Sequence, residues 1–153
     1  MAELATRIKL FSPTVPPGAE ARLGDVLASG QLAQGPKVAE FEFRFAERFA
    51  VPHAVSVNSG TAALETAYDL LHLGPGDEVI TTPLTCTATN LPLRKRGCKL
   101  VWADVERDTL CMDPADVQRK LTERTRAVVQ VHLGGIQANV HALRLPVPVV
   151  SDA

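Results

Sequence analysis

Residues 78–105, EVITTPLTCTATNLPLRKRGCKLVWADV, contain the strand-helix-strand pattern that decides the fold. Glu78 to Thr82 and Lys99 to Val105 are short runs with β-branched residues, which is typical of strands. Residues 85–96 are expected to form a short helix between them, although Pro92 interrupts its pattern. Two strands that are joined by a helix pair in parallel, so this segment predicts one unit of a parallel sheet with helical crossovers.

The same alternation continues on both sides of this segment. Further strands are expected at residues 53–58, 127–133 and 148–151, and further helices at residues 61–73, 113–121 and 140–144. This order predicts an α/β fold, with a largely parallel sheet and helices that cover both of its faces. In such sheets, ligands bind beyond the carboxyl ends of the strands, so the strand-to-helix junctions are the places to search for a site.

Residues 1–52 have a different, helical pattern. Ala19 to Ser29 is expected to form a helix that ends at Gly30, and a second helix follows the GPK turn at residues 35–37. Apolar residues recur at helical spacing in that second helix, and we expect them to pack in a core: Val38, Phe41, Phe45 and Phe49. We therefore divide the chain into an N-terminal helical arm, residues 1–52, and an α/β domain, residues 53–153.

The composition argues against several classes of protein. The 153 residues carry 16 Lys and Arg against 17 Asp and Glu, and this mixture lacks the basic patch of a nucleic-acid or membrane-surface binder. No apolar run approaches the ~20 residues of a transmembrane helix and the first residues lack the apolar stretch of a signal peptide, so we expect a cytoplasmic protein. Three scattered cysteines do not indicate a disulfide framework or a metal site, and we expect Cys98 and Cys111 to fill core space.

The sequence VNSGTAAL, residues 57–64, is the most informative junction. Ser59 is suited to cap a helix, and Gly60 lets the backbone come close to a ligand. Thr61 begins a helix whose free N–H groups and positive dipole end attract an anion, most often phosphate. A capped helix that binds no ligand is the simpler interpretation, and the local sequence leaves both open.

Three further features lie at junctions. Asp152 comes directly after the strand expected at residues 148–151, where a partly buried carboxylate needs a cationic or hydrogen-bonding partner; alternatively, it only caps the next element of the chain. The hydroxyl groups of residues 81–90, TTPLTCTATN, either line a polar cleft or only turn the backbone. His132 has no partner that the sequence identifies, so we interpret it as a structural histidine rather than a base.

Five blocks of sequence occur in a characteristic order along nearly the whole chain. They are SGQLAQGPKVAEFEFRFAERF, VNSGTAAL, LGPGDEVITTPLTCTATN, GCKLVWADVERDTLCMDPADVQRKLTERTRAVVQVHLGG and VPVVSDA. In this order and spacing, they resemble the sugar aminotransferases of the DegT/DnrJ/EryC1/StrS family, which are pyridoxal 5'-phosphate (PLP) enzymes of the type I aspartate-aminotransferase fold. The resemblance implies a homodimeric enzyme, with the N-terminal helices at its interface, that transfers an amino group, usually from glutamate, to a keto group of a nucleotide-linked sugar.

The resemblance also implies roles for four residues. Gly60 and Thr61 match the positions that hold the cofactor phosphate at a helix N-terminus. Asp152 matches the aspartate that pairs with the pyridine nitrogen and keeps it protonated, so that the ring can accept electrons. Cys86 stands where many members carry an aromatic side chain stacked on the ring, and it can offer only a compact contact. Ser151 stands where members usually carry a glutamate.

The resemblance places the Schiff-base lysine after this aspartate, in a Ser-Phe…Lys segment. The chain contains no such segment, and we expect its five lysines to lie at the surface: Lys9, Lys37, Lys95, Lys99 and Lys120. We therefore expect no catalytic residue and no transamination by this chain alone, which would be the N-terminal part of the enzyme with an incomplete PLP-binding domain at residues 53–153. The alternative hypothesis is a non-enzymatic α/β module that binds a nucleotide or other phosphate ligand at Ser59 to Thr61.

Overall fold

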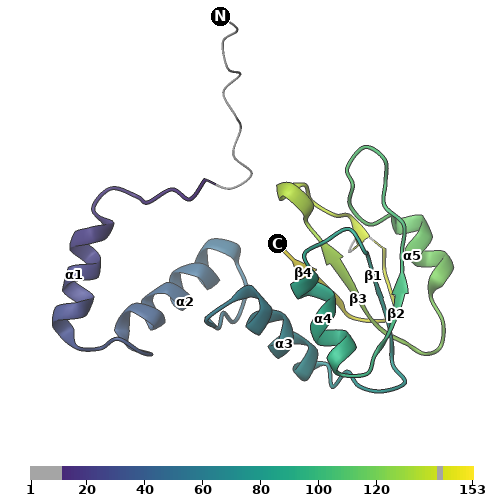
Figure 1. Ribbon diagram of the computed structural model, residues 1–153, viewed down its shortest axis with the longest axis horizontal. Helices are drawn as coiled ribbons and strands as arrows, with labels where there is room; N and C mark the ends of the chain where they lie inside the picture. Colours follow the sequence, from purple (N-terminus) through teal and green to yellow (C-terminus); the bar gives the residue numbers. More distant parts are fainter. Residues whose placement is uncertain (1–11, 141–142) are drawn as a thin grey trace, which may run out of the picture. The chain divides into compact units, whose positions relative to one another are not determined.

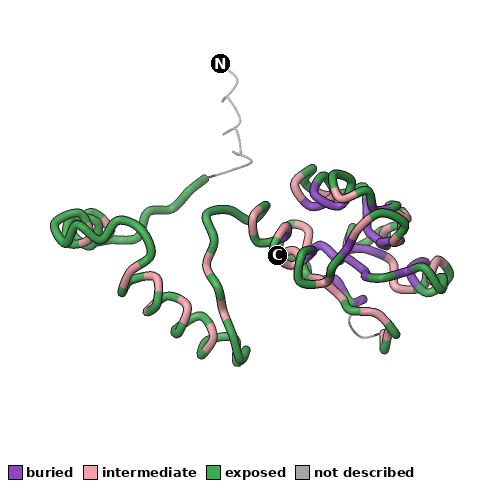
Figure 2. The backbone as a smooth tube through the Cα atoms, turned by 90° about the horizontal axis from the view of Figure 1, so that it is seen from below, coloured by how far each residue is buried: buried purple, intermediate pink, exposed green. Residues whose placement is uncertain are grey.

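The structure, a computed structural model, describes residues 12–140 and 143–153 and divides the chain into two compact units. The first unit comprises Met1–Ser56 and the second comprises Val57–Ala153. This boundary lies four residues after the one between residues 52 and 53 that the sequence suggests. Figure 2 shows that the buried residues belong to the second unit.

The first unit contains two helices, α1 at Ala19–Ser29 and α2 at Pro36–Phe49 (Figure 1). The helix expected at residues 19–29 is confirmed, and it ends where Gly30 takes a left-handed conformation (φ 70°) that glycine adopts without strain. Pro36 occupies the first turn of α2, where its missing N–H costs no helical hydrogen bond. Local turn chemistry therefore determines where α1 ends and where α2 begins.

The prediction that the phenylalanines of α2 are core residues is wrong. Phe41, Phe45 and Phe49 are 55%, 42% and 59% exposed, and no residue of α2 is buried. An amphipathic helix buries its apolar face only against an opposing surface, and the described part of the first unit supplies none. The rings contact one another instead, with centroids 5.8 Å apart for Phe41 and Phe45 and 4.5 Å apart for Phe45 and Phe49.

The second unit is built on a four-stranded parallel sheet with strand order β2-β1-β3-β4. Its strands are β1 at Glu78–Thr81, β2 at Lys99–Trp102, β3 at Thr125–Val131 and β4 at Val149–Asp152. The predicted α/β class with a parallel sheet is therefore confirmed. Figure 1 shows that the helices between the strands lie beside this sheet.

Helices α3 (Gly60–Leu70), α4 (Thr87–Lys95) and α5 (Pro114–Lys120) give the sheet two apolar cores. On one face, the buried side chains of α3 and α4 join those of the central strands: Leu64, Tyr68, Leu93, Val79, Ala127 and Val129. On the other face, α5 contributes Val117 to a cluster with Met112, Ile80 and Val128. The Asp113 side chain caps α5 through the Ala115 N–H at 2.8 Å, as an Asp-Pro pair predicts.

Two predicted elements differ from the structure or lie partly outside it. Residues 53–58 form no strand, because no described strand pairs with them; their Ser56 N–H donates to the Glu42 carboxylate at 2.7 Å instead. A strand depends on a neighbouring ladder, so β-branched composition alone does not create one. The helix expected at 140–144 includes residues 141–142, which lie outside the described residues.

The structure also shows where the cysteines lie, whether side chains cluster as metal ligands do, and how long and apolar the helices are. Cys98 and Cys111 are buried free thiols, which confirms their predicted place in the core, whereas Cys86 is exposed. Within residues 12–140 and 143–153, no cluster of three or more His, Cys, Asp or Glu is arranged to hold a metal ion. Across the same residues, no helix has both the length and the apolar character needed to cross a membrane.

Two leucines of α4 test the core on the α3 side of the sheet. Leu93 is fully buried beside Tyr68 and Val79, whereas Leu91 in the same helix is 44% exposed. We expect Leu93→Ala to lower the free energy of unfolding by about 2–5 kcal/mol, since it leaves a cavity, and Leu91→Ala by at most about 0.5 kcal/mol. Urea unfolding followed by circular dichroism measures both, and equal losses would contradict this core.

Candidate functional site

The first turn of α3 is capped by a side chain and also presents backbone N–H groups that have no acceptor among the described residues. Ser59 is extended (φ −162°) and its Oγ accepts the Ala62 N–H at 3.1 Å, which confirms the predicted cap. The Gly60 and Thr61 N–H groups have no acceptor among the described residues, and both residues are exposed. Apart from its chain neighbours and the backbone of α3 itself, no atom lies within 4 Å of the place where a Gly60 Cβ would stand. These N–H groups, at the positive end of the helix dipole, can bind an anion.

Asp152 is the last residue of β4 and lies next to Val131 of β3 in the sheet register. Its Oδ2 accepts a hydrogen bond of 2.6 Å from the Thr89 hydroxyl. Among the described residues, no hydrogen bond reaches Oδ1 and no cation forms an ion pair with this half-buried carboxylate. Because an unpaired charge is costly away from water, this geometry favours a cationic partner at Oδ1.

The threonine-rich segment at residues 81–90 turns the backbone after β1 and also supplies one hydroxyl to Asp152. The Thr82 Oγ accepts the Leu84 N–H at 3.1 Å and so stabilises the turn after β1. Thr89 is fully buried in α4, and its hydroxyl reaches across 63 residues of sequence to Asp152. Sequence reasoning singled out the segment but missed Thr89, because nothing local indicates which hydroxyl lies beside the end of β4.

Tyr68 is a second member of the site that the sequence did not reveal. It lies in α3, is fully buried, and donates from its hydroxyl to the Thr89 carbonyl oxygen at 3.0 Å. Burial raises the pKa of Tyr68, and the negative charge of Asp152 raises it further, because both disfavour the phenolate. Because its pKa is raised, the Tyr68 hydroxyl keeps its proton and remains a donor to the Thr89 carbonyl oxygen.

Cys86 is an exposed residue at the start of a helix, whereas His132 is hydrogen-bonded to the backbone. Cys86 is the N-cap residue of α4, at the carboxyl side of β1, and its exposed thiol makes no capping hydrogen bond. The His132 Nδ1 accepts the Ala138 N–H at 2.9 Å, which agrees with the interpretation of a structural histidine. Next to Asp152, the exposed Ser151 accepts a 2.7 Å hydrogen bond from the Gln130 side chain of β3.

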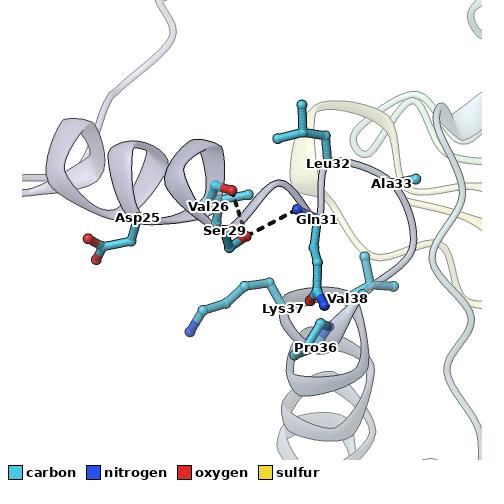
Figure 3. A pocket seen from close by; sticks show the side chains of 10 residues that line it. Asp25, Val26, Ser29, Gln31, Leu32, Ala33, Pro36, Lys37 and Val38 are labelled. Carbon is cyan, nitrogen blue, oxygen red and sulfur yellow. Dashed lines mark hydrogen bonds between the residues drawn. The ribbon is translucent and has the colours of Figure 1, made fainter.

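Two concave spaces lie elsewhere in the chain. A pocket of about 360 Å³ lies at the turn between α1 and α2 in the first unit, with Val26, Leu32 and Val38 in its wall (Figure 3). A space of about 310 Å³ beside β2 is lined by Arg94, Leu100 and Trp102, among others. Neither is lined by any of the four site residues inferred from the sequence.

A comparison with protein-family models identifies the family of this chain. Residues 18–151 match the model of the DegT/DnrJ/EryC1/StrS aminotransferase family. The chain belongs to this family. Its members are PLP-dependent aminotransferases, so the resemblance inferred from the five sequence blocks is confirmed.

Two named relatives each match most of the chain in sequence. It is 45% identical over 119 residues to the spore coat polysaccharide biosynthesis protein SpsC of Bacillus subtilis, covering 78% of this chain and 31% of SpsC. It is 38% identical over 136 residues to the UDP-4-amino-4-deoxy-L-arabinose–oxoglutarate aminotransferase of Shewanella sediminis, covering 86% of this chain and 35% of that enzyme. The chain thus spans about a third of the length of these relatives.

The solved structures agree with the family assignment. The PLP form of Spr1654 from Streptococcus pneumoniae superposes with a TM-score of 0.81 at 34% identity, over 88% of this chain and 34% of that one. Two groups among the described residues have the hydrogen-bonding chemistry that the two polar ends of PLP require. The unpaired Oδ1 of Asp152 can accept a pyridinium N–H, and the free N–H groups of Gly60 and Thr61 can donate to a phosphate.

Tyr68 is the only tyrosine, so its ionisation can be followed alone in the near ultraviolet. The pKa of Tyr68 is higher in the folded protein than in the unfolded chain. The neutral side chain therefore contributes fully to stability below the unfolded pKa of about 10, and this contribution is lost as pH rises from there through the folded pKa. We expect tyrosinate absorbance to appear together with alkaline unfolding, and Tyr68→Phe to abolish this part of the pH dependence. Ionisation in the folded protein at ordinary tyrosine pH would contradict the buried site.

Proposed function

We propose that this chain forms the cofactor-binding part of a PLP-dependent aminotransferase that acts on a nucleotide-linked sugar. The observation that carries the proposal is Asp152, whose Oδ2 is bound by Thr89 at 2.6 Å while Oδ1 has no partner among the described residues. A protonated pyridine nitrogen supplies a positive charge and a hydrogen-bond donor at a single atom, which is the partner that this carboxylate lacks.

Gly60 and Thr61 would hold the phosphate of PLP. Their free N–H groups point outward from an eleven-residue helix whose cap is already complete, so a phosphate can be bound without breaking the Ser59 hydrogen bond. Asp152 would bind the ring nitrogen at the end of β4. When bound, PLP carries the amino group and withdraws electrons from the substrate carbon.

Cys86 is proposed as a neighbour of the ring. It lies at the start of α4, three residues before Thr89, and its thiol is exposed. A thiol provides a small, polarizable contact and cannot stack as an aromatic ring does. We therefore assign the larger part of the binding free energy to Asp152 and to the start of α3.

The names of the relatives support the substrate class. The Shewanella sediminis relative is named for a UDP-linked amino sugar and for oxoglutarate, and SpsC is named for polysaccharide biosynthesis. We propose that glutamate donates the amino group and leaves as oxoglutarate, while a keto sugar linked to a nucleotide receives it. Both half-reactions then balance, with one amino group exchanged for one keto oxygen.

The lysines and the domain arrangement complete the proposal. Lys37, Lys99 and Lys120 are held in ion pairs with Glu40, Glu78 and Asp116. Among the described residues, no lysine contacts Asp152, so we propose that the chain binds the cofactor without a covalent bond and does not transaminate alone. We further propose residues 1–52 as a helical arm at a homodimer interface and residues 53–153 as the cofactor domain.

Pyridoxamine 5'-phosphate tests the binding, because it has the ring nitrogen and the phosphate of PLP but no aldehyde to react with surface lysines. We expect Asp152→Ala to weaken its binding about 10- to 100-fold, as loss of a charge-assisted hydrogen bond does. Thr61→Ala, which removes a hydroxyl but keeps the backbone N–H, should weaken binding about 3- to 10-fold. A fluorescence titration of the bound cofactor measures both changes.

Matched substitutions control for general effects on folding. Asp108→Ala removes an exposed carboxylate that forms no side-chain hydrogen bond or ion pair, and Thr66→Ala removes an exposed hydroxyl further along α3. Both should bind as the unchanged chain does. Equal affinity of all five proteins would sink both assignments, and displacement of the cofactor by ADP at equal concentration would favour a nucleotide-binding module instead.

The activity of the chain is tested by following oxoglutarate production from glutamate and PLP. We expect no production above that of free PLP, because none of the described lysines lies at Asp152 to move the proton. Catalysis by the chain that is lost in Asp152→Ala would refute this expectation and would require a base that we have not assigned.

A further inference from the structure

We infer that Thr89 is a positioning residue, whose hydroxyl holds the Asp152 carboxylate in the orientation that presents Oδ1 to the cofactor ring nitrogen. The inference rests on the proposed function and adds to it a residue that touches neither the cofactor nor the substrate. Its basis is the 2.6 Å bond from the Thr89 hydroxyl to Asp152 Oδ2. This hydroxyl is the only side-chain donor to the Asp152 carboxylate among the described residues.

The hydrogen bonds around Thr89 have a defined direction. A carboxylate only accepts, so the single proton of the Thr89 hydroxyl is directed to Asp152. The oxygens of Thr85 and Thr89 are 2.9 Å apart, and since the Thr89 proton is already used, Thr85 must be the donor between them. The result is a chain of donors from Thr85 through Thr89 to Asp152, in which each bond strengthens the next.

Thr89 is itself held rigidly from the protein interior. The side chain is fully buried, and a β-branched residue in a helix has few accessible rotamers. The Tyr68 hydroxyl donates to the Thr89 carbonyl oxygen at 3.0 Å and so links α4 to α3 at this residue. The position of the Thr89 hydroxyl is therefore set by the core and not by solvent.

This support matters because a carboxylate that turns freely presents no fixed acceptor to a ligand. The carboxylate of an aspartate turns easily about its last side-chain bond, where the torsional preference is broad. One fixed bond to Oδ2 removes this freedom and leaves Oδ1 as the open acceptor. A cofactor whose ring nitrogen binds at Oδ1 then meets an oriented partner and loses less entropy on binding.

A pair of ligands separates this role from general support of the fold. Pyridoxamine 5'-phosphate and its 1-deaza analogue, in which C–H replaces the ring nitrogen, share the phosphate and the ring. The ratio of their affinities measures the contribution of the nitrogen. We expect Thr89→Val to reduce this ratio by about fivefold or more, which corresponds to one net hydrogen bond. Thr89→Ser, which keeps the hydroxyl, should retain most of the ratio.

Controls and contrary results are defined by the same titrations. Thr87→Val, at an exposed threonine of the same helix, should leave the ratio unchanged. An unchanged ratio in Thr89→Val, or equal weakening of both ligands, would overturn the inference; if the valine variant does not fold, Thr89→Ala is judged by the same criterion. If Asp152→Ala lowers the ratio of the two affinities and Thr89→Val does not, this inference alone is overturned. If the unchanged chain binds neither ligand, the proposed function is overturned as well.

Discussion

The pairing of β3 with two neighbours is the interaction on which the second unit depends. β3 pairs in parallel with β1 on one side and with β4 on the other, and β1 and β4 have no direct contact in the strand order. The register of Val131 with Asp152 brings the end of β4 to the same edge of the sheet from which the chain leaves β1 and enters α4. The bond between Thr89 and Asp152 closes this arrangement, because it ties the helix after β1 to the last residue of β4.

Two buried polar side chains in the central strands of the sheet, Glu78 and Gln130, differ in how completely they are hydrogen-bonded. Glu78 is buried in β1, yet its carboxylate accepts hydrogen bonds from Thr122 and Lys99, which lower its pKa and keep it charged. Gln130 is also buried, and its amide nitrogen donates to Ser151, but its Oε1 has no partner among the described residues. The unsatisfied acceptor therefore belongs to a central strand of the sheet, β3, although its amide nitrogen is bonded to the neighbouring β4.

The two units obtain their stability differently. The second unit has two buried clusters, one on each face of the sheet. The described residues of the first unit include none that is buried, and the apolar face of α2 has only the contacts between its own rings. Since helical stability in proteins comes mainly from the packing of an apolar face, α2 is a helix whose sequence is suited to a surface that the described part of the unit does not contain.

Local chemistry in the sequence determined most of the elements and several of their ends: Gly30 ends α1, Ser59 caps α3, and Asp113 with Pro114 begins α5. It also determined the α/β class, because strands and helices alternate, and the family, through the ordered blocks. It failed for residues 53–58 and for the phenylalanines of α2, where the outcome depends on a partner surface. Only the tertiary structure decided that Thr89, of all the hydroxyls in its segment, meets Asp152 and that Tyr68 supports it. The physical reason is that periodicity and capping act within a few residues, whereas the register of parallel strands brings together side chains that are 63 residues apart.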